Sequence, residues 1–202
     1  MNQKDPRVVR TLAQISNAVL ANLERYPFRD ITLIMICQEA KINKTTFYKH
    51  YRDKYDCLNQ YLDAQMASFR RQLNAAFLMA SPDTIDSPVY QEIFARLLRY
   101  IYAHRREYLV LWNAKIDRQI YDEMGDSIYN TLMQQIQISH AFDAQPRIHL
   151  ELYARLFASH TMSLLHWWFS HQDEVTMDDV LRLMTDNMKD GFFKAFKSLP
   201  PC

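Results

Sequence analysis

Residues 31–54 read ITLIMICQEAKINKTTFYKHYRDK, a pattern of two short helices joined by a tight turn. Thr32 is a good helix N-cap, and the helix that it begins is expected to end near Ala40. A turn of three residues, 41–43, ends in Asn43, the expected N-cap of a second helix over residues 44–51, and Asp53 is the expected cap of the helix after it. Two short helices at this spacing are the signature of a helix-turn-helix, whose second helix enters the major groove of DNA.

The second of these helices has two chemically different faces. Phe47 and Tyr51 are four residues apart, and they are expected to pack inward against the preceding helices. The outward face carries basic, hydroxyl and aromatic side chains: Lys44, Thr45, Tyr48 and Lys49. Side chains of these types contact phosphates and base edges, so this helix is predicted to read DNA.

Two lysines stand in the first turns of predicted helices, Lys44 in the second helix of the motif and Lys54 in the helix that follows. A cation there opposes the helix dipole, at a cost of some tenths of a kcal/mol up to about 1 kcal/mol. A phosphate bound at each helix N-terminus would remove that cost. The alternative is that solvent alone surrounds both lysines.

A resemblance to the TetR/AcrR family of bacterial transcriptional regulators rests on the run Thr46-Phe47-Tyr48-x-His50-Tyr51-x-x-Lys54 and on the helix-turn-helix before it. The resemblance covers about residues 8–62. It implies an all-α protein of about nine helices. Its DNA-binding domain would span residues 1–54, followed by a connecting helix over about 54–79. A ligand-binding and dimerisation domain would span residues 55–202.

Carried over position by position, the resemblance implies a set of DNA contacts. It places five side chains near phosphates: Thr32, Thr46, Tyr48, His50 and Lys54. It places three side chains toward base edges: Lys44, Thr45 and Lys49.

Two positions depart from the family pattern. Lys41 stands where the family usually has a glycine in the turn, and a left-handed residue other than glycine costs about 1–2 kcal/mol. Alternatively, the turn adjusts its shape and Lys41 adds a phosphate contact. Thr45 stands where glycine is frequent, so its side chain is expected to contribute to base choice.

Composition and charge agree with a helical protein that binds DNA with one part of the chain. The 202 residues include only 2 glycines, fewer than turn-rich β folds or phosphate-binding loops need. Residues 1–60 hold 10 Lys and Arg against 6 Asp and Glu, whereas residues 61–202 hold 14 against 17. This imbalance favours a polyanionic partner for the first part only.

Neither a membrane-length apolar stretch nor a secretory signal is recognisable, so we expect a cytoplasmic protein with no membrane partner. The cysteines lack metal-binding spacing, and Cys37 is expected to be a buried thiol. No two histidines have the i, i+4 spacing of a helical metal site. We therefore expect no metal, no cofactor and no enzymatic activity.

The remainder of the chain is also expected to be helical. Apolar residues at helical spacing predict a first helix over about residues 8–26. Further helices are predicted after a proline-containing loop at 81–88; they cover about residues 89–104, 105–114, 117–138, 147–171 and 177–197.

The last two predicted helices are apolar enough to serve as a dimer interface, and the resemblance implies a homodimer formed through them. The alternative is that they only complete the core of one chain. Aromatic residues in the body are expected to line a site for a small-molecule effector, with Trp112, Tyr153 and His160 as candidates.

These observations predict a ligand-responsive repressor that binds a palindromic operator as a homodimer. Some members of the family are activators or respond to a partner protein, among them regulators of dihydroxyacetone kinase genes. Two other classes are an interaction protein that has lost DNA binding and an enzyme built on a helical bundle.

Overall fold

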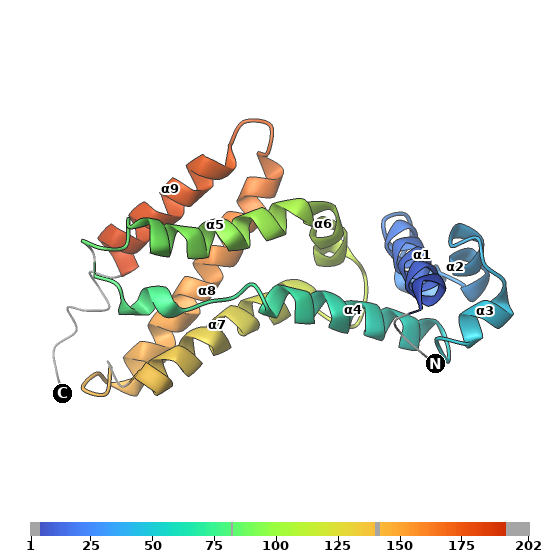
Figure 1. The fold of residues 1–202 in the computed structure, drawn as a ribbon, viewed down its shortest axis with the longest axis horizontal. Helices are drawn as coiled ribbons and strands as arrows, with labels where there is room; N and C mark the ends of the chain where they lie inside the picture. Colours follow the sequence, from blue (N-terminus) through green and yellow to red (C-terminus); the bar gives the residue numbers. More distant parts are fainter. Residues whose placement is uncertain (1–4, 82, 140–141, 193–202) are drawn as a thin grey trace. The chain divides into compact units, whose positions relative to one another are not determined.

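The computed structural model describes residues 5–81, 83–139 and 142–192, and within these residues all regular structure is helical. The predicted all-α class is confirmed (Figure 1). Two compact units are present. The first unit comprises residues 1–68 and 106–120, and the second unit comprises residues 69–105 and 121–202. No helix in the described part of the chain is both long enough and apolar enough to cross a membrane.

The first unit is built from short helices around a fully buried core. Its elements are α1 (Pro6–Leu23), η1 (Phe28–Asp30), α2 (Leu33–Glu39), α3 (Lys44–Tyr48), most of α4 (Lys54–Arg70) and nearly all of α6 (Arg105–Asn113). Ile15 from α1, Ile36 from α2 and Phe47 from α3 are all inaccessible to solvent. Burying such side chains contributes about 1.5–3 kcal/mol each, so their packing fixes the three helices together.

Polar side chains begin the helices of this unit at the positions that the sequence predicts. Thr32 Oγ1 accepts a hydrogen bond from the backbone N–H of Met35 at 3.2 Å. Asn43 Oδ1 accepts one from the N–H of Thr46 at 2.7 Å. Asp53 Oδ1 accepts two from the N–H groups of Tyr55 and Asp56, both at 2.8 Å. Each contact satisfies an N–H group that has no partner within its own helix.

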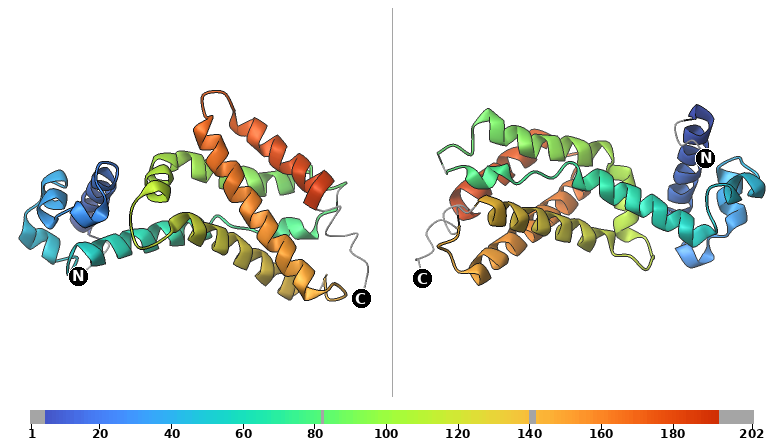
Figure 2. Two further views of the ribbon diagram at one scale, coloured as in Figure 1. Left: turned by 180° about the vertical axis from the view of Figure 1, so that it is seen from behind. Right: turned by 60° about the horizontal axis from the view of Figure 1, so that its bottom comes forward.

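The second unit is a bundle of longer helices. Its elements are η2 (Ala76–Met79), α5 (Pro88–Ala103), α7 (Ile120–Ser139), α8 (Arg147–Ser170), α9 (Met177–Asn187) and a π-helical turn, η3 (Met188–Phe192). Helix α9 lies beside α5, and α8 leads from the end of α7 to the loop before α9 (Figure 2). Trp168 of α8 is buried and donates its indole N–H to the carbonyl of Val175 at 3.1 Å, which fixes that loop.

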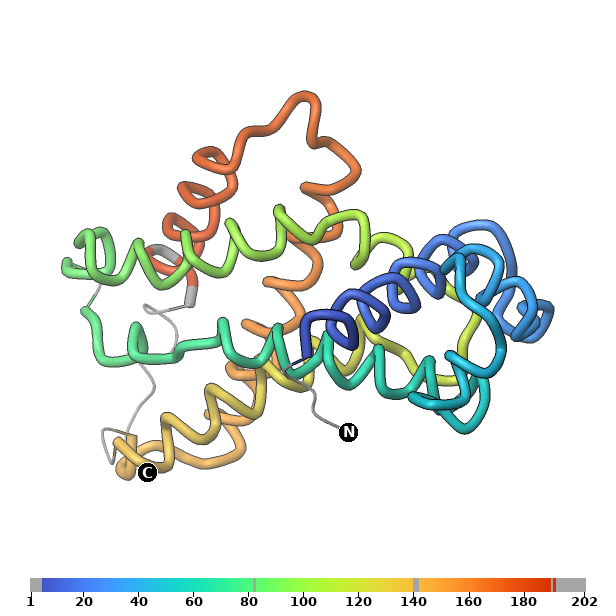
Figure 3. The backbone as a smooth tube through the Cα atoms, turned by 45° about the vertical axis from the view of Figure 1, so that its right-hand side comes forward, coloured from blue at the N-terminus to red at the C-terminus, as the bar shows by residue number. Residues whose placement is uncertain are grey.

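The prediction of one helix over residues 54–79 is wrong, because α4 ends at Arg70. The chain then runs without regular structure through residues 73–75 and forms the short η2 (Figure 3). Asn74 Oδ1 accepts a hydrogen bond from the N–H of Ala76 at 2.8 Å. Asparagine favours such local turns over helix interiors, and the buried Ala75 and Phe77 are packed by the irregular path rather than by a helical stripe.

Other boundaries differ less. Helix α1 ends at Leu23 rather than Tyr26, because Pro27 disfavours helical geometry in the residue before it. Helix α3 ends at Tyr48, three residues short of the prediction. Helix α9 ends at Asn187, and residues 193–197 of the predicted last helix lie outside the described part of the chain.

Candidate nucleic-acid interface

The turn between α2 and α3 has the left-handed geometry that glycine favours. Lys41 has φ of 55°, and no other described non-glycine residue has a positive φ. The N–H groups of Lys41 and Ile42 donate to the carbonyls of Gln38 and Cys37 at 3.1 and 3.0 Å, which closes the end of α2. The turn therefore keeps its shape and bears the strain of a side chain at this position, about 1–2 kcal/mol.

Helix α3 divides into the two predicted faces. Phe47 is fully buried, and its ring lies 5.3 Å from that of Tyr51, which is also buried. Lys44, Thr45 and Lys49 are exposed. Tyr48 is 57% exposed although its side chain is a large aromatic one, whereas the adjacent Phe47 is buried. An exposed ring flanked by two lysines and a hydroxyl is a surface suited to phosphates and bases.

Four of the five residues that the resemblance places near phosphates lie on α3, in the turn after it or at the start of α2. Thr32 is the exposed N-cap of α2. Thr46 and His50 are half-buried, Thr46 within α3 and His50 in the turn after it. The structure thus gathers seven of the eight predicted DNA-binding residues on α3, its following turn and the start of α2: Thr32, Lys44, Thr45, Thr46, Tyr48, Lys49 and His50.

Lys54, the eighth, has an internal role that the sequence did not reveal. Its Nζ donates hydrogen bonds to the carbonyl oxygens of Phe28 and Arg29 at 3.2 Å and of Ile31 at 2.6 Å. The ammonium also lies 4.9 Å from the ring centroid of Phe28 and 5.2 Å from that of Tyr55. Lys54 thus ties the first turn of α4 to the carbonyl end of η1. A phosphate contact by Lys54 stays a prediction.

A distant part of the chain completes this unit. Arg106 of α6 pairs with both carboxylate oxygens of Glu24, at 3.1 and 2.7 Å, and this hydrogen-bonded pair holds the pKa of the Glu24 carboxyl below its usual range. Arg118 Nη1 pairs with Asp63 Oδ1 at 2.7 Å. Tyr108 is fully buried. The helix-turn-helix therefore shares one compact unit with residues 106–120.

The three candidate effector residues are divided between the two units. Tyr153 and His160 line one groove of about 220 Å³ in the second unit, with Leu156, Phe157, Asn187, Met188 and Gly191. Trp112 lies on α6 in the first unit, where its ring is 6.1 Å from that of Tyr108. Tyr153 and His160 are seven residues apart on α8, a spacing of about two helical turns that places them on one face, whereas no spacing relates Trp112 to them.

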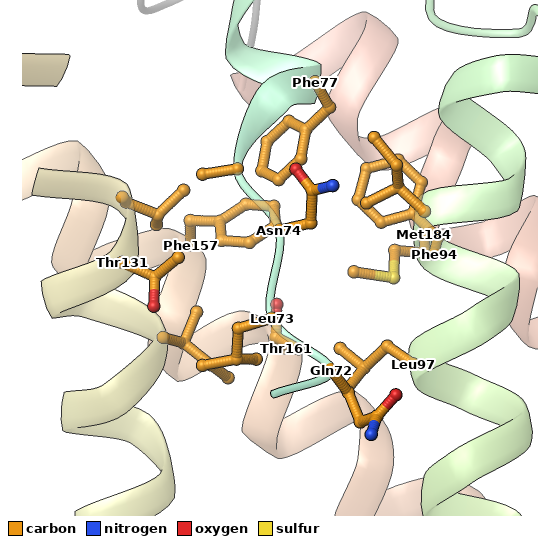
Figure 4. Close-up of a pocket in the computed structure, with 14 residues that line it drawn as sticks. Gln72, Leu73, Asn74, Phe77, Phe94, Leu97, Thr131, Phe157, Thr161 and Met184 are labelled. Atoms are coloured by element: carbon orange, nitrogen blue, oxygen red, sulfur yellow. The ribbon is translucent and has the colours of Figure 1, made fainter. Parts of the chain in front are cut away.

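A second cavity of the second unit was missed by sequence reasoning. Fourteen residues line it, from the segment after α4 and from α5, α7, α8 and α9; the lining is mainly apolar and includes Thr131 and Thr161 (Figure 4). The segment after the end of α4 supplies five of the fourteen lining residues, and the sequence marks that end only by Asn74.

The described residues include a buried free cysteine and no cluster of side chains suited to a metal ion. Cys37 is buried as predicted, and burial raises the pKa of its thiol. Among residues 5–81, 83–139 and 142–192, no group of three or more histidine, cysteine or acidic side chains is placed to hold a metal ion.

Comparisons with known proteins agree with this architecture. Residues 90–190 match a TetR family model described as the transcriptional regulator C-terminal region. The chain is 20% identical over 158 residues to the HTH-type transcriptional regulator YxbF of Bacillus subtilis strain 168. That match covers 78% of this chain and 39% of YxbF, so the chain spans about two fifths of the length of this relative.

Two solved structures share the fold at low identity. The fatty acid degradation regulator FadR from Bacillus halodurans is 13% identical with a TM-score of 0.61, covering 93% of this chain and 97% of FadR. The dihydroxyacetone kinase operon activator DhaS is 15% identical with a TM-score of 0.56, covering 93% of this chain and 96% of DhaS. With half of its length matched by the family model, the chain belongs to the TetR family of transcriptional regulators.

Proposed function

We propose that this regulator binds a palindromic DNA operator as a homodimer and that a small-molecule effector changes its affinity for the operator. The observation that carries the proposal is the division of α3, with Phe47 buried and Lys44, Thr45, Tyr48 and Lys49 exposed. A helix held rigidly by its inner face can present the outer face to base edges at little entropic cost.

Within this proposal the exposed residues have separate roles. Lys44, Thr45 and Lys49 read base edges, where lysine favours guanine and a threonine methyl favours thymine. Thr32, Thr46, Tyr48 and His50 contact phosphates and fix the register of the helix. Lys54 acts differently from the family expectation, because its three protons already face carbonyl oxygens, and we assign it to positioning α4.

An apolar ridge along α8 supports the homodimer. Ile148, Leu152 and Leu156 follow one another at a spacing of four residues and are 69%, 54% and 52% exposed. Trp167 near the end of α8 and Leu183 of α9 are also exposed. Large apolar side chains aligned on one helix face mark a surface for association. A second copy would cover the ridge symmetrically and pair two recognition helices for the two half-sites.

Repression relieved by the effector is the direction that the family resemblance favours, and activation is the alternative. One protein with a similar fold, DhaS, is described as an operon activator, so activation is tested as well. Because chromosomal DNA is the proposed partner, the proposed location is the cytoplasm. A reporter gene placed behind the operator, with and without the regulator, distinguishes the two directions.

The test of the central proposal is selection of bound fragments from a random DNA pool by the full chain, followed by fluorescence anisotropy on the selected site. We expect an inverted repeat and an affinity that falls steeply as salt rises. Absence of enrichment, together with no binding at low salt, would mean that the chain does not bind DNA.

A further inference from the structure

The cavity shown in Figure 4 has apolar walls and a buried polar group, two features of small-molecule binding sites. It lies entirely in the second unit and is lined by α5, α7, α8 and α9 and by the segment that follows α4. Apolar side chains from these elements line it, among them Phe77, Phe94, Leu97 and Phe157. Such walls exclude water and offer dispersion contacts to an apolar molecule.

One polar group in the lining has no partner. Thr161 of α8 is only 2% exposed, and its hydroxyl makes no hydrogen bond. Thr131 and Thr185, in the same unit, each donate at 2.8 Å to the carbonyl four residues earlier. A buried hydroxyl without a partner is costly, and it is rare in native proteins unless a ligand or water completes it.

The lining also lacks charge. Its polar members are amides and hydroxyls, namely Gln72, Asn74, Thr131 and Thr161, and no acidic or basic side chain is among the fourteen residues. An ionised ligand would lose its hydration here without gaining an opposite charge, which strongly disfavours its binding. A neutral ligand with one polar group matches both the apolar walls and the single unpartnered hydroxyl.

We propose that this cavity is the effector site and that its ligand is a small uncharged apolar molecule with one hydroxyl or carbonyl group, which pairs with the hydroxyl of Thr161. This inference rests on the proposed function, because it names the effector of the same regulator. The groove of Tyr153 and His160 suits an apolar ligand less well, because Leu156, His160 and Asn187 in its wall are exposed to solvent.

The size of the cavity assigns a role to the segment after α4. Its volume is about 30 Å³, which accommodates water-sized groups but not a whole organic molecule. Four walls are regular helices, whereas residues 72–75 form the wall that leaves the helical path. Binding displaces this wall. Because residues 72–75 continue directly from α4, whose first turn holds Lys54, the displacement acts on the helix that leads to the DNA-binding unit.

The test measures binding of four six-carbon probes to the full chain by isothermal titration calorimetry at neutral pH. The neutral probes are 1-hexanol and 2-hexanone, and the charged probes are hexanoate and hexylammonium. We expect saturable binding of both neutral probes, with the charged probes at least about tenfold weaker. The inference is overturned if charged and neutral probes bind equally well, or if one or both of the neutral probes fail to bind saturably.

Substitutions locate the site. Thr161→Val keeps the shape and removes the hydroxyl, so it should weaken 1-hexanol binding about fivefold to tenfold, whereas Thr161→Ser should retain most of the affinity. Thr185→Val is the matched control, because Thr185 is equally buried but absent from the lining. If Thr161→Val and Thr185→Val change the affinity alike, the pairing with Thr161 is wrong.

Anisotropy on the selected operator separates the two proposals. Probes that bind with the expected selectivity and shift operator affinity at least about threefold support the effector role. Probes that bind without changing operator affinity overturn it. If the chain binds the neutral probes with the expected dependence on Thr161 but binds no DNA, the ligand site stands and the proposed function fails.

Discussion

The ammonium of Lys54 donates a 2.6 Å hydrogen bond to the carbonyl oxygen of Ile31, the residue that follows η1. The first turn of α4 is therefore locked to the segment that leads into α2. The family resemblance places Lys54 at a phosphate. In this chain its ammonium links α4 to the segment that precedes α2.

Lys54→Met should lower the free energy of unfolding by about 2 kcal/mol, because it removes a charged donor and leaves three carbonyl groups without it. Operator affinity should fall as well, with the slope of log affinity against log salt unchanged. Urea unfolding and anisotropy at several salt concentrations measure the two effects. Lys49→Met, which removes the same charge from an exposed position, should leave stability unchanged. A slope reduced by about 0.9 with unaltered stability would show instead that Lys54 contacts a phosphate.

Lys41→Gly should stabilise the protein by about 0.5–1 kcal/mol, the strain of the left-handed backbone less the entropy that glycine gains on unfolding. Lys41→Ala removes the same charge but keeps a Cβ at φ of 55°, so it should bring no such gain. Thermal unfolding of the pair isolates the backbone effect. Equal stability of the two variants would mean that the turn is not strained.

Thr45→Gly should relax the base preference at one position of each half-site, at a cost of about 1–3 kcal/mol for the preferred base. The reason is that Thr45 is exposed on the outward face of α3. Repeating the selection from the random pool with the variant measures the change. Asp30→Asn, an exposed change in η1, is the control and should leave the preference as it is. A uniform loss over all positions would place Thr45 at a phosphate.

Leu152→Glu should raise the dimer dissociation constant about 100-fold or more, because a dimer would bury two carboxylates without partners. Analytical ultracentrifugation of the full chain measures the constant. Val89→Glu places the same charge at an exposed apolar position of α5, 71% exposed, and should have little effect. Dissociation by both variants, or by Val89→Glu alone, would move the interface away from α8.

Arg106→Gln should reduce the acid sensitivity of unfolding. The pKa of Glu24 is lowered in the folded state by its hydrogen-bonded Arg106, so the pair contributes stability above the unfolded carboxyl pKa. That contribution is lost as pH falls through the lower folded pKa. The pair is largely exposed, so the expected effect is a few tenths of a kcal/mol to about 1 kcal/mol near neutral pH. The test is the denaturant midpoint of unfolding measured across the acid pH range, with Arg10→Gln as the control. If the midpoint depends on pH in the same way in both variants, the prediction is wrong.

The sequence predicted those features that depend on short-range chemistry. Thr32, Asn43 and Asp53 cap their helices because a side-chain oxygen reaches N–H groups two or three residues ahead. The two faces of α3 follow from the spacing of Phe47 and Tyr51. The left-handed Lys41 was foreseen as one of two outcomes, since a family glycine marks the position.

Features that depend on distant residues were not predictable from one sequence. Nothing local to Lys54 shows that three carbonyl groups from residues 28–31 converge on it. The end of α4 at Arg70 is set by packing of the segment around Phe77. The hydroxyl of Thr161 resembles that of any helical threonine until the walls around it are known.

The first unit, which contains the helix-turn-helix, is discontinuous along the chain, and Arg106 and Arg118 pair with Glu24 and Asp63. During synthesis these ion pairs cannot form until residue 118 has left the ribosome, after α5 of the second unit has already been made. The N-terminal segment must therefore wait for part of the second unit before its own fold is complete. A fragment cut after α4 would lack the buried Tyr108 and both ion pairs, so we expect it to be less stable than the complete first unit.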